Sequence, residues 1–319
     1  MQPLVAWWER HQVPLYLLAM VVAAAVGLTV PPVAAPAEAA ITPVLGLLLY
    51  ATFLGVPFGS LTAALREGRF LATVLVVNFA VVPGIVLVLS RIVAHDEALL
   101  VGVLFVLLTP CIDYVLAFTR LAGGAHARLL AMTPLLMLVQ IALLPAYLVL
   151  FVGSEVVGAV EFAPFAEAFV LLIVIPLLAA ALTQAVAARS EAGLRWEQGV
   201  AGAMVPLMML TLAVVVASQI AGVGARVGSL LLAVPVYVLF AVVMVPIGII
   251  AGRVARLDVP GTRAVVFSAA TRNSLVVLPL VLALPARYDL APLVVVTQTL
   301  VELIAMVVFV RLVPRLVRA

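Results

Sequence analysis

Most of this 319-residue chain consists of long apolar runs, which are separated by short segments rich in proline, glycine or arginine. A helix needs about 20 apolar residues to cross the hydrocarbon core of a bilayer. The spacing of the runs predicts ten membrane-spanning helices, five in each half of the chain. They cover about residues 13–30, 42–64, 70–93, 97–121, 127–152, 163–187, 198–221, 229–252, 263–285 and 290–313.

Two of the predicted spans are interrupted by short polar segments. The fourth span breaks at Thr109-Pro110-Cys111-Ile112-Asp113, and the ninth breaks at Thr271-Arg272-Asn273-Ser274. Lipid cannot hydrogen-bond freed backbone groups, so a broken helix persists at membrane depth only against protein or a wet cavity. We therefore expect the two breaks to face each other in one water-reachable pocket and to form a transport site.

The composition is that of an integral membrane protein. Hydrophobic residues make up 67% of the chain and charged residues 10%, with a mean hydropathy of +1.36. A soluble domain carries about 25% charged residues. The predicted spans leave no room for a soluble domain. The net charge of +3 does not indicate a nucleic-acid partner, because all basic residues are arginine and no basic block occurs.

The sequence offers no pattern for an enzyme or a resident cofactor. Cys111 is the single cysteine, which excludes an intrachain disulfide and a paired-cysteine metal site. The three histidines lack metal-ligand spacing, and there is no glycine-rich loop to cradle a phosphate. We expect no cofactor beyond a transported proton or sodium ion. The first apolar run lacks a convincing cleavage site and is interpreted as a retained helix.

The distribution of arginines predicts how the chain is oriented. If the N-terminus is cytoplasmic, 13 of the 17 arginines fall on the cytoplasmic side. Only Arg91, Arg226 and Arg287 fall outside, and Arg272 lies within the membrane. Cytoplasmic loops are enriched in basic residues. We therefore expect a multi-pass protein of the cell (inner) membrane with both termini in the cytoplasm.

The two halves of the chain match in outline. We expect a first five-helix repeat at residues 1–155 and a second at residues 156–319, joined by a polar connector at 153–162. The third span of each half contains a proline, Pro83 or Pro246, and the fourth contains the break. An odd number of spans inverts the second half relative to the first. Inverted repeats with discontinuous helices are a recurrent transporter plan.

The residues of the breaks suit the binding of a solute. The restarted half-helices carry partial positive charge at their N-termini, which would hold an anion, while the unwound carbonyls would hold a cation. Asn273 and Ser274 are natural N-capping residues. The substrate-binding candidates are Thr109, Cys111, Asp113, Thr271, Arg272, Asn273 and Ser274.

Several of these residues have structural alternatives. Cys111 suits a thiophilic solute, but free cysteine is also a common small, buried apolar residue. Asp113 and Arg272 are either part of the transport site or a fixed ion pair between the crossing helices. Glu302 is a candidate proton carrier or a hydrogen-bonded structural carboxylic acid. The ion-coupling candidates are Asn78, Asp113, Ser268 and Glu302.

Four segments carry a resemblance to a known group of transporters. They are Thr109-Pro110-Cys111-Ile112 with Leu121-Ala122-Gly123-Gly124, Asn78 with Pro83, Leu300-Val301-Glu302-Leu303, and Ser268-Ala269-Ala270-Thr271-Arg272-Asn273-Ser274. With these segments the chain resembles the bile acid:sodium symporter superfamily, and within it the arsenical resistance permeases. The resemblance implies that Cys111 handles arsenite and that Glu302 is the acidic residue of the tenth helix.

The resemblance also implies a fold. Helices 3–5 and 8–10 would form a core with crossed, discontinuous helices 4 and 9. Helices 1, 2, 6 and 7 would form a panel, with a cavity between the two that opens alternately to each side. The chain departs from sodium-coupled members, which place serine and asparagine where Val115 and Leu116 stand. Their ninth-helix glutamate and glutamine correspond to Ser268 and Arg272, and the glutamate of arsenite permeases corresponds to Leu275.

Three functions remain open. The leading hypothesis is a secondary active transporter that works by alternating access and extrudes arsenite in exchange for protons. The alternative is a sodium- or proton-coupled transporter of a small organic anion, with Arg272 and the helix ends binding a carboxylate. A membrane sensor or scaffold is disfavoured because no soluble output domain is present. The expected partners are the lipid bilayer and a small inorganic or organic solute, in a monomer or a homodimer.

Overall fold

The computed structural model describes residues 2–55, 67–112, 114–153, 167, 170–282 and 284–318. Within these ranges the chain is built from helices, and the breaks of two of them meet in a single isolated bridge. The chain forms two compact units. Unit 1 comprises Met1–Val56 and Phe162–Arg226, and unit 2 comprises Pro57–Glu161 and Val227–Ala319.

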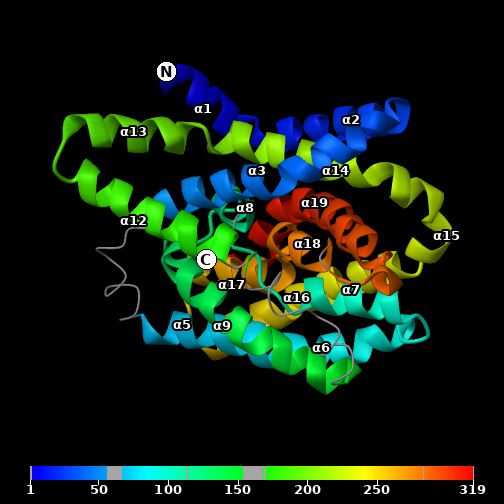
Figure 1. Cartoon of the computed structure of the whole chain (residues 1–319). Coiled ribbons are helices and arrows are strands. Elements are labelled where there is room, and N and C mark those ends of the chain that lie inside the picture. The colour runs from blue at the N-terminus through cyan, green and yellow to red at the C-terminus, as the bar shows by residue number, and fades with distance from the viewer. Residues whose placement is uncertain are drawn as a thin grey trace. The chain divides into compact units, whose positions relative to one another are not determined.

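Unit 1 is organised around α14 (Met204–Ala225), which packs against α2 (Gln12–Thr29) and α3 (Ala34–Leu54) (Figure 1). Two further helices, α12 and α13, complete the packing around α3. Trp196 of α13 donates to the Tyr50 hydroxyl at 2.9 Å, and that hydroxyl lies 2.9 Å from Thr183 of α12. The remaining elements are α1 (Gln2–Arg10), η1 (Pro31–Val33), η5 (Val170–Val174), α12 (Ile175–Ala187) and α13 (Glu191–Gly202).

Unit 2 contains both interrupted spans. The first is α7 (Glu97–Leu107) followed by α8 (Tyr114–Leu121), and the second is α17 (Val259–Ala270) followed by α18 (Ser274–Leu282). The other elements are α5 (Gly68–Val76), η3 (Val77–Val81), α6 (Val82–Leu89), η4 (Ser90–Val93), α9 (His126–Val152), α15 (Val227–Leu230), α16 (Ala233–Val254), η6 (Ala286–Tyr288) and α19 (Ala291–Leu316).

The helices agree with the predicted spans in place, with some differences at their ends. Both predicted breaks are present. The second span begins at Ala34, because Pro31-Pro32 opens η1 and the chain turns directly into α3. The seventh span is preceded by the separate helix α13, which Ser190 caps. Residues 56–66 and nearly all of the predicted connector lie outside the described ranges.

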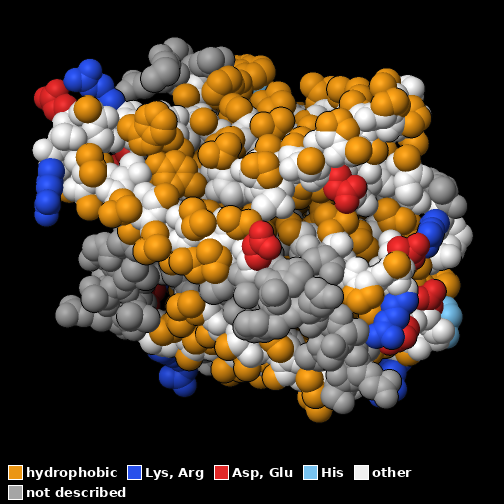
Figure 2. All heavy atoms as spheres, in the orientation of Figure 1, with side chains coloured by type: hydrophobic (Ala, Val, Ile, Leu, Met, Phe, Trp, Pro, Cys, Tyr) orange, Lys and Arg blue, Asp and Glu red, His pale blue; other side chains and the backbone are white. Residues whose placement is uncertain are grey.

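Seven helices of the described chain are long and apolar enough to cross a membrane. Two shorter apolar helices, Pro14–Thr29 and Glu97–Leu107, accompany them. Figure 2 shows that hydrophobic side chains cover much of the face drawn. Exposed aliphatic residues of the chain include Leu182, Val242 and Ile304. Apolar surface on this scale marks a protein that contacts lipid. The chain is therefore a multi-pass helical membrane protein.

The two units group the described helices as the resemblance predicted for a panel and a core. Unit 1 holds the helices of spans 1, 2, 6 and 7, and unit 2 holds those of spans 3–5 and 8–10. The predicted division at residues 1–155 and 156–319 describes two sequence repeats, and a grouping of helices by their packing does not test it. The inverted repeat and the count of ten spans therefore stay predictions.

Small residues let α16 approach α17 closely. A Cβ added to Gly248 would lie 2.7 Å from the Val266 Cα, and one added to Gly252 would lie 2.6 Å from the Thr262 Cγ2. Glycines four residues apart form one helix face, and such faces are common where membrane helices pack. This contact holds α17, and with it the second break, against a continuous helix.

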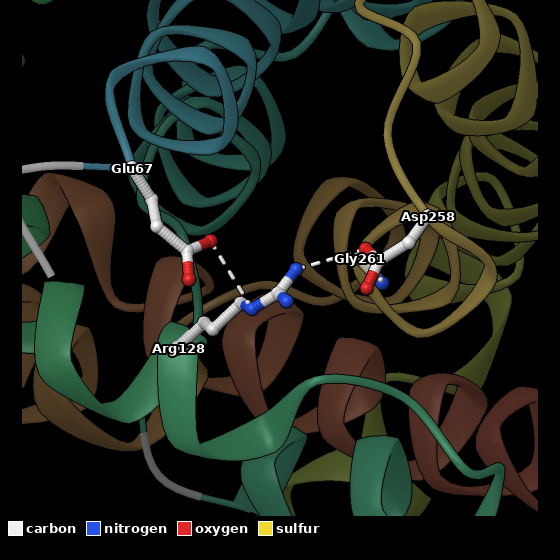
Figure 3. Close-up of polar contacts among 4 residues, drawn as sticks. All are labelled: Glu67, Arg128, Asp258 and Gly261. Carbon is white, nitrogen blue, oxygen red and sulfur yellow. Dashed lines mark hydrogen bonds and ion pairs between the residues drawn. The ribbon is translucent and has the colours of Figure 1, made fainter.

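An ion-pair cluster fixes the other end of α17. Arg128 of α9 donates to the Asp258 carboxylate at 2.8 Å and lies 3.1 Å from the Glu67 carboxylate (Figure 3). Asp258 also caps α17, because the same oxygen accepts the Gly261 backbone N–H. Arg128 therefore connects the starts of three elements of unit 2: α5, α9 and α17.

A tyrosine hydroxyl bonds to a carbonyl of the π-helical turn in the third span. Pro83 has no backbone N–H, so it cannot donate to the Phe79 carbonyl four residues earlier. The Tyr147 hydroxyl of α9 donates to that carbonyl at 2.5 Å. The bond ties α9 to η3, the element that also carries Asn78.

We predict that Tyr147→Phe lowers the free energy of unfolding by about 1 kcal/mol, because it removes the hydroxyl donor from the Phe79 carbonyl, for which Pro83 offers no N–H. Tyr237→Phe is the matched control. The Tyr237 hydroxyl donates to the Val294 carbonyl at 3.1 Å, but that carbonyl lies inside α19 and keeps its helical bond. Thermal unfolding in detergent measures both variants. Equal losses would contradict this role of Tyr147.

Candidate functional site

The two breaks lie against each other as a short antiparallel crossing. Pro110 and Arg272 form the isolated bridge. The Cys111 backbone N–H donates to the Thr271 carbonyl at 3.4 Å, and the Asn273 N–H donates to the Thr109 carbonyl at 2.9 Å. Backbone groups freed by each break are thus satisfied by the other break. We call this crossing, with its flanking half-helix ends, the crossover.

Each break begins with a threonine that bonds back to its own half-helix. The Thr109 hydroxyl donates to the Phe105 carbonyl at 2.9 Å, and the Thr271 hydroxyl donates to the Phe267 carbonyl at 2.7 Å. A threonine four residues after a carbonyl commonly makes this bond. The hydroxyls satisfy carbonyls near the C-terminal ends of α7 and α17, so the two breaks share a local design.

The Arg272 guanidinium is fully buried and collects carbonyl oxygens from several elements. One terminal nitrogen donates to the Asn78 Oδ1 at 2.7 Å and to the Ser268 and Ala269 carbonyls at 2.8 Å. The other donates to the Leu107 carbonyl at 3.3 Å. The side chain therefore joins the C-terminal ends of α7 and α17 to η3.

Two neighbours fix this arrangement. The guanidinium carbon lies 5.3 Å from the centre of the Phe240 ring, a cation–π geometry. Asn78 donates from its amide to the Ser268 hydroxyl at 3.0 Å, while its carbonyl oxygen faces Arg272. The Asn78 amide also donates to the Val74 carbonyl at 3.0 Å, and because a carbonyl can only accept, this bond sets the orientation of the amide. Its acceptor is thereby directed at the cation.

Glu302 of α19 holds the opposite side of the crossover. Its carboxylate accepts the Tyr114 hydroxyl at 2.6 Å and the Arg272 backbone N–H at 2.7 Å. It also accepts the Gln298 amide. Glu302 and Gln298 line a cavity of about 10 Å³, which has room for about one water molecule. The carboxylate thus connects α8, the second break and α19.

The start of α18 contains a donor that the described residues leave unused. The Asn273 side-chain oxygen accepts the Val276 backbone N–H at 3.3 Å and so caps the helix. The Asn273 amide nitrogen has no hydrogen-bond partner in the described structure, although the residue is only 1% exposed. Ser274 lies beside it and accepts the Thr299 hydroxyl at 2.8 Å.

The structure brings almost all of the predicted site residues together at the crossover. They are Asn78, Thr109, Cys111, Ser268, Thr271, Arg272, Asn273, Ser274 and Glu302. Asp113 lies outside the described residues, and so does its predicted ion pair with Arg272. The roles of all these residues in solute binding or ion coupling stay predictions.

The crossover is closely packed around two of the predicted site residues. Cys111 and Arg272 are both 0% exposed, so neither described side chain reaches water in this conformation. The half-helix ends and their hydrogen bonds enclose these side chains. The predicted water-reachable pocket also includes Asp113, which lies outside the described residues, so the pocket stays a prediction.

Tyr114, Phe240 and Gln298 contact the crossover but were not among the candidates from the sequence. Tyr114 is the first residue of α8 and gives Glu302 a hydroxyl donor at 2.6 Å. The sequence did offer a signal for Tyr114, because it is a polar aromatic residue directly after the first break. Phe240 lies inside an apolar span, and nothing in the sequence marks it. Among the residues that the structure describes, no cluster of His, Cys, Asp and Glu could hold a metal ion.

Comparison with known protein families gives a match. The model of the Sodium Bile acid symporter family matches residues 42–230, which is more than half of the chain. The matched region contains the first break and ends before the second. No curated protein matches the chain.

We predict that Glu302→Gln lowers the free energy of unfolding by about 2 kcal/mol or more. The Glu302 carboxylate accepts three donors on two oxygens, whereas a glutamine amide has only one acceptor oxygen. Glu97→Gln is the matched control. Its carboxylate also accepts a tyrosine hydroxyl, that of Tyr288 at 3.1 Å, but Glu97 is exposed. Thermal unfolding in detergent should show a clear loss for Glu302→Gln and almost none for Glu97→Gln. Similar melting of the two variants would contradict a structural role for Glu302.

Proposed function

Because the chain belongs to the sodium bile acid symporter family, we propose that it is a secondary active, ion-coupled transporter of a small organic anion. Members of this family are transporters rather than enzymes. The observation that carries the proposal is the crossover in unit 2, where two discontinuous helices meet. Discontinuous helices that meet at membrane depth are the usual solute site of such transporters.

The chemistry of the crossover favours an anion. The N-terminal ends of α8 and α18 carry partial positive charge. The Asn273 amide and the Arg272 Nε are buried N–H donors without a partner among the described residues. An unpaired buried donor costs free energy, so a solute that brings oxygen acceptors would be bound there. A small carboxylate has this chemistry.

Transport would proceed by alternating access, with unit 2 carrying the solute site. Two inverted five-helix repeats, at residues 1–155 and 156–319, would provide the two related conformations. Both termini would lie in the cytoplasm, as the arginine distribution predicts. The solute would bind at Thr109, Thr271, Asn273 and Ser274, with Asn78, Asp113, Ser268 and Glu302 as candidates for ion coupling.

We predict that Asn273→Asp reduces uptake of a labelled small carboxylate into proteoliposomes by about tenfold or more, because the amide donor becomes a repelling acceptor. An aspartate still caps α18, so the fold is retained. Asn273→Ser is the matched control, because serine supplies both a cap and a donor, and it should keep most of the uptake. Wild-type protein that carries no carboxylate from a broad panel would refute the proposal.

Arsenite efflux coupled to protons is the second candidate. It is favoured by Cys111, a buried thiol-bearing residue within the crossover, and by the resemblance to the arsenical resistance permeases. In this case the thiol would bind arsenic, and Glu302 or Asp113 would carry the proton. Glu302 is the described carboxylate that touches the crossover directly.

We predict for this candidate that Cys111→Ser and Cys111→Ala abolish the arsenite resistance that the wild-type protein confers on a sensitive host. Uptake of the carboxylate should stay within about twofold, because these small substitutions retain the packing. Growth in graded arsenite measures the first effect and proteoliposome uptake the second. Full resistance with Cys111→Ser, or none with the wild-type protein, would rule out the cysteine-based candidate.

A further inference from the structure

The Arg272 guanidinium lies where two helix ends converge. Leu107 is the last residue of α7, and Ser268 and Ala269 lie in the last turn of α17. The last four carbonyls of a helix have no partner within that helix, and the C-terminus carries partial negative charge. Arg272 donates to a carbonyl of each helix end at 3.3 Å or less.

The oxygens around this guanidinium have the chemistry of a site for a hard cation. Three are backbone carbonyls at helix ends, and the fourth is the Asn78 side-chain oxygen, 2.7 Å from the nearest guanidinium nitrogen. In transporters with broken helices, unwound carbonyls and half-helix C-termini are the groups that coordinate a coupling cation such as sodium. A sodium ion at the crossover would need these same oxygens.

We propose that Arg272 is a built-in cation, which permanently takes the place of a coupling sodium ion at the crossover and makes transport independent of sodium. The proposal rests on the proposed transport function. An arginine side chain stays protonated in proteins, so this charge is always present. It is also tethered to the chain, and it therefore cannot be released and rebound during a transport cycle.

The surroundings of Arg272 are built for a fixed charge. The Phe240 ring contributes cation–π attraction, which is stronger where water is excluded. Asn78 directs its oxygen at the cation because its amide nitrogen donates to the Val74 carbonyl and to the Ser268 hydroxyl. Full burial prevents exchange of the guanidinium with solvent. These contacts involve η3, α7, α16 and α17, so the charge joins four elements of unit 2.

The first test uses wild-type protein in proteoliposomes. Uptake of the labelled carboxylate should change by less than about twofold when N-methylglucamine replaces all sodium. In detergent, added sodium chloride should raise the melting temperature no more than choline chloride does. Uptake that falls about tenfold or more without sodium would overturn the inference and leave the proposed transport function intact.

The second test removes the tethered charge. Arg272→Gln leaves the carbonyl oxygens in place and opens room among them, so this variant should gain a requirement for sodium. Its melting temperature should rise by about 3 °C or more with sodium chloride relative to choline chloride. Arg272→Lys keeps one positive charge and should melt at the same temperature in both salts. Sodium-dependent melting of Arg272→Lys, or equal melting of Arg272→Gln in the two salts, would contradict the inference.

The matched control is Arg263→Gln. Arg263 also donates to carbonyls near helix ends, those of Ala122 at 3.0 Å and Val317 at 2.9 Å. Its removal should destabilise the protein equally in both salts, because the effect there is structural only. A sodium-specific rise in Arg263→Gln would show that the salt acts elsewhere. Thermal unfolding needs no solute, so it tests the inference even if no carboxylate is transported. If Arg272→Gln does not fold, the sodium dependence of uptake and of melting in the wild-type protein decides.

Discussion

The need to satisfy backbone hydrogen bonds inside a membrane governs the centre of unit 2. Each break frees N–H and C=O groups that lipid cannot satisfy. The two breaks pair with each other through Cys111 and Asn273, and the threonine at the start of each break bonds back to its own half-helix. Neither break would be stable alone. The crossing is therefore a condition for having two interrupted helices at all.

Arg272 extends this arrangement from the backbone to the side chains. Its backbone N–H is accepted by Glu302, while its guanidinium is accepted by the ends of α7 and α17 and by Asn78. The backbone N–H of Arg272 thus donates to a carboxylate, while its guanidinium is surrounded by carbonyl oxygens. A buried charge is tolerable only when it is hydrogen-bonded in this way.

The sequence predicts the breaks but not the contacts that they make. Pro110, Cys111 and Arg272 stand out because they interrupt long apolar runs, and breaks in membrane helices must face protein or a wet cavity. The pairing of Pro110 with Arg272 depends on the relative height of two helices, which no local pattern encodes. The short helix α13 escaped prediction because its apolar residues are few and merge with the neighbouring span.

The residues around Glu302 differ in how they would respond to a proton. Its oxygens accept three donors, and a proton would turn one of these oxygens into a donor itself. The Arg272 backbone N–H cannot reverse, whereas the Tyr114 hydroxyl can either donate or accept. Gln298 can also adapt, because its side-chain oxygen has no partner among the described residues and amide rotation would present it to Glu302. The guanidinium charge is permanent, whereas Glu302 could take up a proton, and its two adaptable neighbours could change their hydrogen bonds to accommodate that proton.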